Sequence, residues 1–177
     1  MAATSPLVLV LMGVSGCGKS TTGAALSKAL GWPFRDADSF HPEANIDKMS
    51  RGIPLTDEDR MPWLAAIAQW IDERRERAGP GIVSCSALKR AYRQRIIGAR
   101  DRVRLVYLKG DMDLIGRRVQ ARKQHFMPAT LLESQFATLE EPRADERPVI
   151  VNVAMSPRRV VCAILDALGL EAGSEGA

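Results

Sequence analysis

Three glycines, a lysine and a hydroxyl group stand close together in the stretch GVSGCGKS, which runs from Gly13 to Ser20. Glycines let a backbone wrap closely around phosphate oxygens, and the amide hydrogens of such a loop attract anions. Lys19 can then reach the terminal phosphates of a nucleotide, and Ser20 can ligate Mg²⁺. The stretch predicts a phosphate-binding loop rather than a glycine-rich turn that only joins two elements.

The residues on either side of this loop predict a strand before it and a helix after it. The run LVLVLM before it starts at Leu7 and has no apolar–polar alternation, as in a strand buried on both faces of a parallel sheet. The run TTGAALSKAL after it predicts a helix whose N-terminus attracts phosphate. The predicted nucleotide contacts are Gly13, Val14, Ser15, Gly16, Cys17, Gly18, Lys19, Ser20 and Thr21.

Further short apolar runs, each followed by a segment with helical spacing, predict the remaining strands. They begin at Phe34, Gly81, Val103 and Val149. Strands that alternate with helices form a parallel α/β sheet covered on both faces. The 177 residues suit one such domain, over residues 1–170, and the tail at 171–177 has almost nothing to bury.

Two helices of these layers can be delimited by their end signals. One is predicted from Pro62, at a first-turn position, to the breaker at 79–81, with apolar side chains along one face. The last helix has Ser156 as N-cap, Pro157 in its first turn and Gly169 at its C-terminus.

Two carboxylates, Asp36 and Asp38, follow the second predicted strand, in a polar segment over 36–64 without helical or strand period. Ligands bind at the carboxyl ends of strands in open α/β sheets, and an extended backbone would put both side chains on one side. One carboxylate could hold Mg²⁺ through water while the other accepts a hydrogen bond from an attacking hydroxyl and acts as its base. The residues alone leave the order of the two roles open, and a solvated acidic turn is the alternative.

Composition narrows the function classes. The 25 basic and 21 acidic residues give a net charge of +4, which fits an enzyme of anionic phosphates and equally a nucleic-acid-binding protein. No base-reading motif of the GTPase type occurs, and the third strand, GIVSCS, lacks a terminal acidic residue.

Cys17, Cys85 and Cys162 are widely spaced and predict neither disulfides nor a zinc site. No apolar run is long enough to span a membrane, so we expect a cytoplasmic protein.

Four stretches stand out along the whole chain: GVSGCGKS, DADSFHPEANIDKMSRGIPLTDEDRMPWL, CSALKRAYR and ARKQHFMPATLLESQFATLEEP. Together they resemble the gluconate kinase family, the thermoresistant-type gluconokinases, from about Leu7 to Leu168. The resemblance implies a P-loop kinase fold with five parallel strands in the order 2-3-1-4-5. It also implies transfer of the ATP γ-phosphate to the 6-hydroxyl of D-gluconate, Mg²⁺ as cofactor, usually a homodimer, and a role in gluconate catabolism that feeds the pentose phosphate or Entner-Doudoroff pathway.

The resemblance further implies roles for individual residues. Asp38 becomes the contact of the reacting hydroxyl, and Asp36 lies nearer the metal, with Ser20. Guanidinium groups can bind a carboxylate through two parallel hydrogen bonds, which suits a sugar acid. The expected substrate-binding residues are Asp38, His41, Lys48, Arg51, Arg60, Lys89 and Gln135. The cations among them could instead be surface charges, and Trp63 fits the buried face of its helix better than a sugar platform.

A helix end rich in arginines runs into a short loop before Pro128 and predicts a small helical lid over about 117–137. Arginines on such a segment can close over the phosphates, exclude water and neutralise charge. By resemblance Arg118 and Arg122 are expected to act in catalysis, one over phosphate and one against adenine, and Pro157 to lie near the base.

Two other functions remain as alternatives. One is a kinase for another small hydroxy acid, such as shikimate, or for a nucleoside, because a phosphate loop does not choose the acceptor. The other is a nucleic-acid-binding ATPase, which would bind RNA or DNA in a salt-sensitive way. No basic strand interleaved with aromatic residues supports the second, and it leaves the segment at 36–64 without a purpose.

Overall fold

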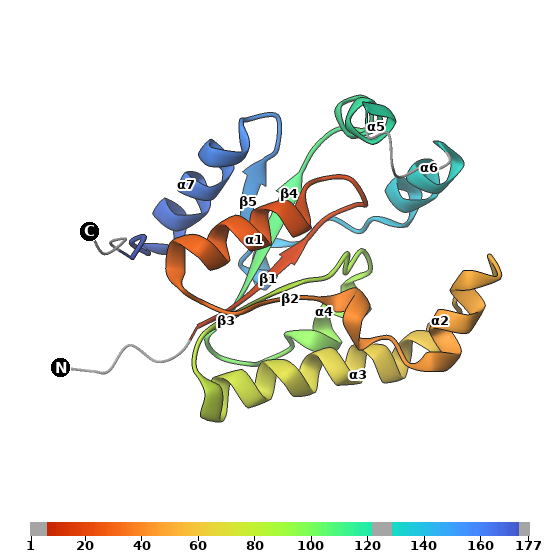
Figure 1. Cartoon of the computed structure of the whole chain (residues 1–177), viewed down its shortest axis with the longest axis horizontal. Helices are drawn as coiled ribbons and strands as arrows, with labels where there is room; N and C mark the ends of the chain where they lie inside the picture. Colours follow the sequence, from red (N-terminus) through yellow and green to blue (C-terminus); the bar gives the residue numbers. More distant parts are fainter. Residues whose placement is uncertain (1–6, 122–128, 174–177) are drawn as a thin grey trace.

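A parallel five-stranded sheet forms the centre of the computed structural model, which describes residues 7–121 and 129–173 (Figure 1). The strand order is β2-β3-β1-β4-β5, which confirms the expected topology. The strands are β1 Val8–Met12, β2 Phe34–Asp36, β3 Gly81–Ser84, β4 Val103–Lys109 and β5 Val149–Asn152. Because all strands are parallel, their carboxyl ends meet at one edge, where ligands bind in this architecture.

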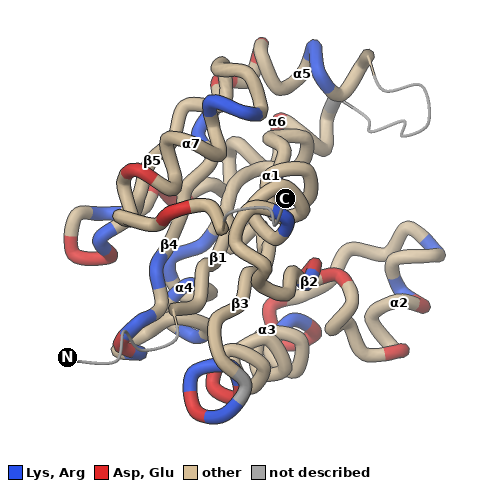
Figure 2. The backbone as a smooth tube through the Cα atoms, turned by 60° about the vertical axis from the view of Figure 1, so that its left-hand side comes forward, with Lys and Arg blue, Asp and Glu red and all other residues tan. Residues whose placement is uncertain are grey.

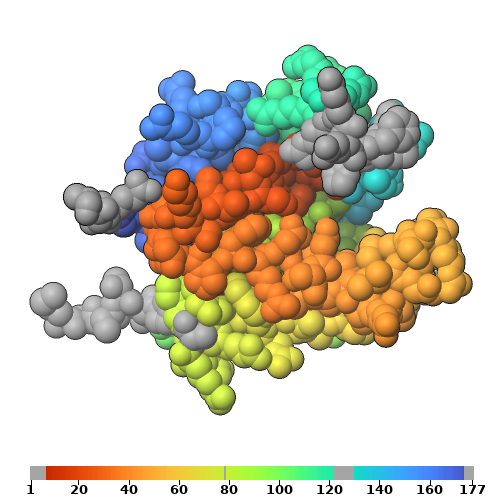
Figure 3. Space-filling view, in the orientation of Figure 1, coloured from red at the N-terminus to blue at the C-terminus, as the bar shows by residue number. Residues whose placement is uncertain are grey.

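Helices cover both faces of the sheet. One face carries α1 Lys19–Leu30 and α7 Pro157–Leu168, and the other carries α3 Asp57–Glu73 and α4 Arg90–Ile96 (Figure 1). Short helical turns are η1 Ala37–Phe40, η2 Arg74–Ala78 and η3 Ala144–Glu146. The remaining helices are α2 Glu43–Ser50, α5 Met112–Ala121 and α6 Ala129–Thr138. Figure 3 shows α2 as a projection from the body, below α5 and α6.

The first strand is completely buried, as its uniform apolar run predicts. Val8, Val10 and Met12 face the core under α3 and α4, whereas Leu9 and Leu11 face the core under α1 and α7. Full burial of one such leucine stabilises the fold by roughly 1.5–3 kcal/mol. Because β1 is packed on both sides, the loop that follows it leaves from a rigid point.

The start of α3 corrects the prediction for Pro62, which lies inside the helix and not in its first turn, because α3 already begins at Asp57. Thr56 caps this start: its hydroxyl accepts from the Asp59 N–H at 3.1 Å, and the Asp59 carboxylate accepts from the Thr56 N–H at 2.9 Å. A capping box and an acidic first turn both favour a helix N-terminus. They outweigh the intrahelical hydrogen bond that Pro62 removes.

The polar segment at 36–64 contains more regular structure than its sequence indicates. Asp38 lies on η1, so the extended backbone expected for Asp36 and Asp38 is wrong beyond Asp36. The next element, α2, has eight residues, of which only Asn45 is buried. A helix that buries no apolar stripe has no periodic signal in the sequence.

The last helix begins and ends as predicted. Ser156 Oγ accepts from the Arg159 N–H at 3.4 Å, Pro157 opens α7, and Gly169 ends it with a φ angle of 62°. Beyond it, the Gly173 N–H donates to the carbonyl of Ala29 on α1 at 2.8 Å. Charges of both signs are spread over the chain (Figure 2), and within the described ranges no helix has the length and apolar character to cross a membrane.

Candidate active site

The phosphate loop leaves β1 at Gly13 and enters α1 at Lys19. Gly16 and Gly18 have φ angles of 85° and 99°, in the left-handed region. A side chain at Gly16 would also clash with α5, because its Cβ would lie 2.5 Å from Cγ2 of Val119. The loop therefore needs glycine for its backbone conformation and for its close approach to α5.

The side chains of the loop divide between the core and the ligand side. Val14 and Cys17 are 3% and 1% exposed, so they anchor the loop and offer a ligand only their backbone. Burial raises the pKa of the Cys17 thiol. Lys19 Nζ donates to the carbonyl oxygens of Gly13 and Val14 at 2.8 and 3.1 Å, which keeps the ammonium group at the loop. Among the residues that the structure describes, no side chain caps the first amides of α1, so these amides can bind an anion.

Asp36 connects the end of β2 to the phosphate loop. Its Oδ2 accepts from Ser20 Oγ at 2.9 Å, and its Oδ1 accepts from the Asp38 N–H at 3.0 Å. Asp38 is exposed on η1, and within residues 7–121 and 129–173 no group donates a hydrogen bond to its carboxylate. The structure thus brings together the Ser20 hydroxyl, the Asp36 carboxylate, which accepts two hydrogen bonds, and the Asp38 carboxylate, which is open in the sense that no described group donates to it.

His41 stacks on Trp63 beside these carboxylates, with ring centroids 4.5 Å apart and planes 8° apart. Trp63 is buried, as expected, and its Nε1 donates to the carbonyl of Ala37 on η1 at 2.7 Å. His41 Nδ1 lies 3.3 Å from Nδ2 of Asn45. Burial lowers the pKa of His41, against the opposing effect of the Asp38 charge. This part of the segment therefore presents a neutral imidazole on a fixed indole.

Both predicted substrate cations at the end of α2 already have carboxylate partners. Lys48 Nζ lies 2.7 Å from both carboxylate oxygens of Asp59, and this hydrogen bonding lowers the pKa of Asp59. Arg51 pairs with Asp47 at 2.5 Å, with both side chains mostly exposed. Lys48 thus ties α2 to the start of α3, whereas Arg51 lies on the surface of the projection.

Asp57, Arg60, Lys89 and Tyr92 form a connected cluster between α3 and α4. Lys89 Nζ lies 3.1 and 3.2 Å from the two Asp57 oxygens, and the Tyr92 hydroxyl donates to Asp57 Oδ1. Arg60 Nη1 donates to the Tyr92 oxygen at 3.1 Å. Hydrogen bonds from Tyr92 and Lys89 lower the pKa of Asp57, and the bond to Asp57 raises the pKa of Lys89. Two predicted substrate residues, Arg60 and Lys89, are therefore joined through two unassigned ones.

Gln135 on α6 contacts the phosphate loop. Its Oε1 accepts from the Ser15 N–H at 2.6 Å, and its Nε2 donates to Ser15 Oγ at 2.8 Å. The two bonds link α6 to the loop across 120 residues of sequence. The contact of Gln135 in this structure is thus with the nucleotide-binding loop rather than with the segment at 36–64.

Arg118 on α5 lies against the turn that follows β5. Its Nη2 donates to the carbonyl of Val153 at 2.5 Å, and Pro157 begins α7 just beyond this turn. Arg118 and Pro157, which are both predicted nucleotide contacts, therefore lie near the same turn. Arg122, the other predicted lid arginine, lies outside the described residues.

Comparisons with known proteins place the chain among small-molecule kinases. A protein-family model described as shikimate kinase matches residues 15–167. A gluconokinase of Gluconobacter oxydans (strain 621H) is 47% identical over 145 residues, which cover 82% of this chain and 81% of the relative. The chain belongs to the gluconokinase family. A crystal structure of a gluconokinase from Sinorhizobium meliloti 1021 matches with a TM-score of 0.82 at 47% identity, over 93% of this chain and 92% of that one. A shikimate kinase structure from Bacteroides thetaiotaomicron, 18% identical over 94% of this chain and 100% of that one with a TM-score of 0.69, shows the shared fold alone.

Three polar residues of this region were left unassigned in the sequence, namely Asn45, Asp57 and Tyr92, and Arg93 was expected to assist Lys89 in binding a carboxylate or phosphate. Arg93 is 1% exposed, and its Nη1 donates to the carbonyls of Ala87 and Leu88 at 2.9 and 3.1 Å. It thereby fixes the segment that leads to Lys89. The stretch TDED carries a capping pattern that could have placed Asp57 at a helix start, whereas nothing in the sequence marks Arg93 as buried.

Proposed function

We propose that this protein transfers the γ-phosphate of ATP to the 6-hydroxyl of D-gluconate, giving 6-phospho-D-gluconate and ADP. One observation carries the proposal: the open carboxylate of Asp38 is linked through Asp36 to Ser20 of the phosphate loop. A phosphate loop with a base beside it is what a kinase of a hydroxyl group needs. The gluconokinases among the relatives supply the identity of the acceptor.

In this mechanism Asp38 orients the attacking hydroxyl and accepts its proton, which suits a carboxylate with free lone pairs. Lys19 stabilises the charge that develops on the transferred group, and Arg118 and Arg122 assist from the lid. The transfer is direct. Cys85, at the end of β3, is unsuited to forming a covalent intermediate because burial raises its pKa to about 12.

Ser20 and Asp36 are the residues that would hold Mg²⁺. Their oxygens lie 2.9 Å apart, and hydroxyl and carboxylate oxygens suit this ion. In the part of the chain that the structure describes, no three His, Cys, Asp or Glu side chains gather as a metal site. This fits an ion held by one or two protein oxygens, substrate phosphates and water. Bound Mg²⁺ supplies neutralisation of phosphate charge.

The carboxylate of gluconate is assigned to Arg60, with Lys89 beside it, and the hydroxyls to His41 and Lys48. Arg51, paired on the surface of the projection, is given a supporting role. The assignment follows the charges: a sugar acid needs a cation whose charge is not already neutralised.

The nucleotide base is assigned to the turn after β5, between Arg118 and Pro157, with Gln135 as a contact of the loop rather than of the sugar. The proposal includes a small-molecule substrate, for which the gluconokinases among the relatives are the support. We further propose a homodimer in the cytoplasm that binds no nucleic acid.

Release of ADP by the purified protein tests this function. With Mg-ATP, release should depend on D-gluconate and should not occur with shikimate, free sugars or nucleosides. Asp38→Asn should lower kcat by about 10²–10⁴-fold, because the base is lost while the shape is kept. Glu43→Gln, an exposed acid at the start of α2, is the matched control and should keep wild-type turnover. Release that follows shikimate instead would overturn the substrate, and full turnover in Asp38→Asn would overturn the base.

A further inference from the structure

The cluster of Asp57, Arg60, Lys89 and Tyr92 has a net charge of +1. Arg60 and Lys89 are cations, Asp57 is an anion and Tyr92 is neutral at pH 7. The hydrogen bonds within the cluster favour these charge states, since the pKa of Asp57 is lowered and that of Lys89 is raised. One uncompensated positive charge matches a ligand with a single carboxylate.

That charge resides on Arg60. Lys89 shares its ammonium group with Asp57, just as Lys48 is paired with Asp59 and Arg51 with Asp47. Among residues 7–121 and 129–173, the only hydrogen-bond acceptor of the Arg60 guanidinium is the neutral Tyr92 hydroxyl, at 3.1 Å. A guanidinium held by a neutral oxygen keeps its attraction for an incoming carboxylate.

The direction of the hydrogen bonds follows from the single proton of the Tyr92 hydroxyl. That proton is donated to Asp57, so the phenol oxygen has only lone pairs left, and these accept from Arg60. The negative charge of Asp57 polarises the hydroxyl and strengthens the second bond. The Tyr92 ring also lies 5.8 Å from the Arg60 guanidinium carbon and 5.4 Å from Lys89 Nζ. One aromatic residue therefore restrains both cations.

We propose that Tyr92 is a positioning residue for substrate recognition: through its hydroxyl it holds the Arg60 guanidinium in the orientation that binds the carboxylate of the sugar acid. Asp57 fixes the direction of that hydroxyl. The inference rests on the proposed function, and it adds to that function the element that recognises the acid group. Tyr92 acts through Arg60 and does not contact the reacting atoms.

Tyr92→Phe removes only the hydroxyl oxygen and keeps the ring. The KM for D-gluconate should rise by about fivefold to twentyfold, as for the loss of one hydrogen bond to a charged group. The kcat and the KM for Mg-ATP should stay within about twofold, because Arg60 binds ground and transition states alike at a distance from the phosphate. A general loss of structure would instead change all three parameters.

A double-mutant cycle shows whether Tyr92 works through Arg60. Arg60→Gln alone should raise the KM for gluconate, and adding Tyr92→Phe to it should raise the KM by less than about twofold further. Tyr107→Phe is the matched control, since it removes the other phenol hydroxyl of the chain, which donates to Glu141 at 3.2 Å, and it should leave the KM unchanged.

Three results would overturn the inference. An unchanged KM in Tyr92→Phe, with gluconate-dependent turnover in the wild type, removes the role of Tyr92 and leaves the proposed function intact. Additive effects in the cycle mean that Tyr92 does not act through Arg60. No gluconate-dependent turnover in the wild type overturns the proposed function and this inference together.

Discussion

Asp36 and Asp38 are one residue apart, yet their surroundings differ. The Asp36 carboxylate accepts from the Ser20 hydroxyl and from a backbone amide, so its lone pairs are partly used. The Asp38 carboxylate, on the first turn of η1, has no such donor among the described residues. A carboxylate that already faces the phosphate loop suits a metal, and an open one suits a base. This difference supports the division of roles that the residues alone left open.

His41 gives a prediction on the dependence of stability on pH. Burial lowers its pKa below the ordinary value of 6.5, so on acidification the unfolded chain takes up the proton before the native protein does. The free energy of unfolding should therefore fall as the pH drops through about 6.5, and the fall should end at the folded-state pKa. Urea unfolding at several pH values between about 5 and 7.5 measures this slope.

In His41→Gln the slope should be shallower by at most about 1.4 kcal/mol per pH unit, the limit for one proton. Ala44→Gln, which places the same amide group at an exposed neighbouring position and changes no titrating group, is the control and should keep the wild-type slope. The same slope in wild type and His41→Gln would mean that other groups determine the acid sensitivity.

At the residue scale, the sequence predicts what lies close along the chain. The phosphate loop and the pair Asp36 and Asp38 could be located because their spacing is local. The bond between Tyr92 and Asp57 joins residues 35 positions apart, and only the packing of α4 on α3 brings them together. Neither residue has a pattern around it that predicts such a partner.

At the element scale, α1 packs closely against β2 at Gly23. A Cβ at this position would lie 2.3 Å from the ring of Phe34. Gly23→Ala should improve helix propensity by about 1 kcal/mol, but relief of the overlap should cost about 1–3 kcal/mol, so we expect a net loss of stability. Urea unfolding measures the change. Since β2 ends at Asp36, kcat should fall as well.

The double variant Gly23→Ala with Phe34→Leu is the control, because the smaller side chain makes room for the new methyl group. It should be destabilised by less than the sum of the two single variants. A Gly23→Ala protein more stable than the wild type would show that β2 can move away from α1 without cost.

Elements with a continuous apolar run or with clear helix end signals were the predictable ones. The buried β1 and the capped α7 appear at the expected residues, whereas α2 was missed. Its contacts explain why: α2 is held by Asn45 and Lys48, which both bond to Asp59 on α3. A helix held in place by polar contacts to another element carries no stripe in its own sequence.

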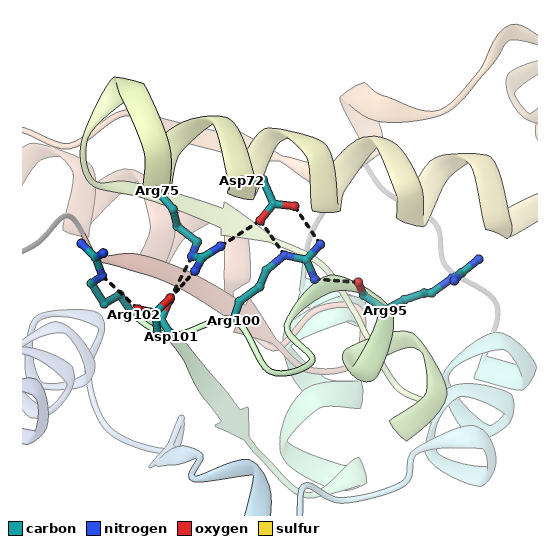
Figure 4. A network of polar contacts seen from close by, with 6 residues as sticks. All are labelled: Asp72, Arg75, Arg95, Arg100, Asp101 and Arg102. Carbon is teal, nitrogen blue, oxygen red and sulfur yellow. Dashed lines mark hydrogen bonds and ion pairs between the residues drawn. The ribbon is translucent and has the colours of Figure 1, made fainter.

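At the scale of the whole molecule, two charged networks hold distant segments together. One, drawn in Figure 4, joins α3 to the turn before β4: Asp72 accepts from Arg75 and from Arg100, and Arg75 also contacts Asp101. The hydrogen bond from Arg100 lowers the pKa of Asp72. This network lies at the surface, where solvent screens each pair.

The other network joins α4 and the loop before it to the connection between α6 and β5, and it is less exposed than the first. Arg93 Nε and Nη2 donate to the two Glu146 oxygens at 2.6 and 3.1 Å, with side chains 1% and 13% exposed. The Glu140 N–H also donates to the Leu88 carbonyl at 2.9 Å. Because Lys89 follows Leu88, this network fixes one side of the substrate site from a segment about fifty residues away in sequence.

The two networks differ in burial, and this difference leads to a prediction. Arg93→Gln should lower the free energy of unfolding by about 1.5–3 kcal/mol, because it removes both guanidinium hydrogen bonds from the mostly buried Glu146 carboxylate, which among the described residues keeps only Arg90, at 3.7 Å, as a cation. Arg100→Gln, the control in the surface network, should cost about 1 kcal/mol or less. Both changes are measured by urea unfolding. Removing the stranded charge in Arg93→Gln with Glu146→Gln should restore part of the loss. Equal losses of unfolding free energy in Arg93→Gln and Arg100→Gln would mean that burial does not determine the strength of these pairs. The connection between α6 and β5 would then be held to the substrate site by its backbone contacts.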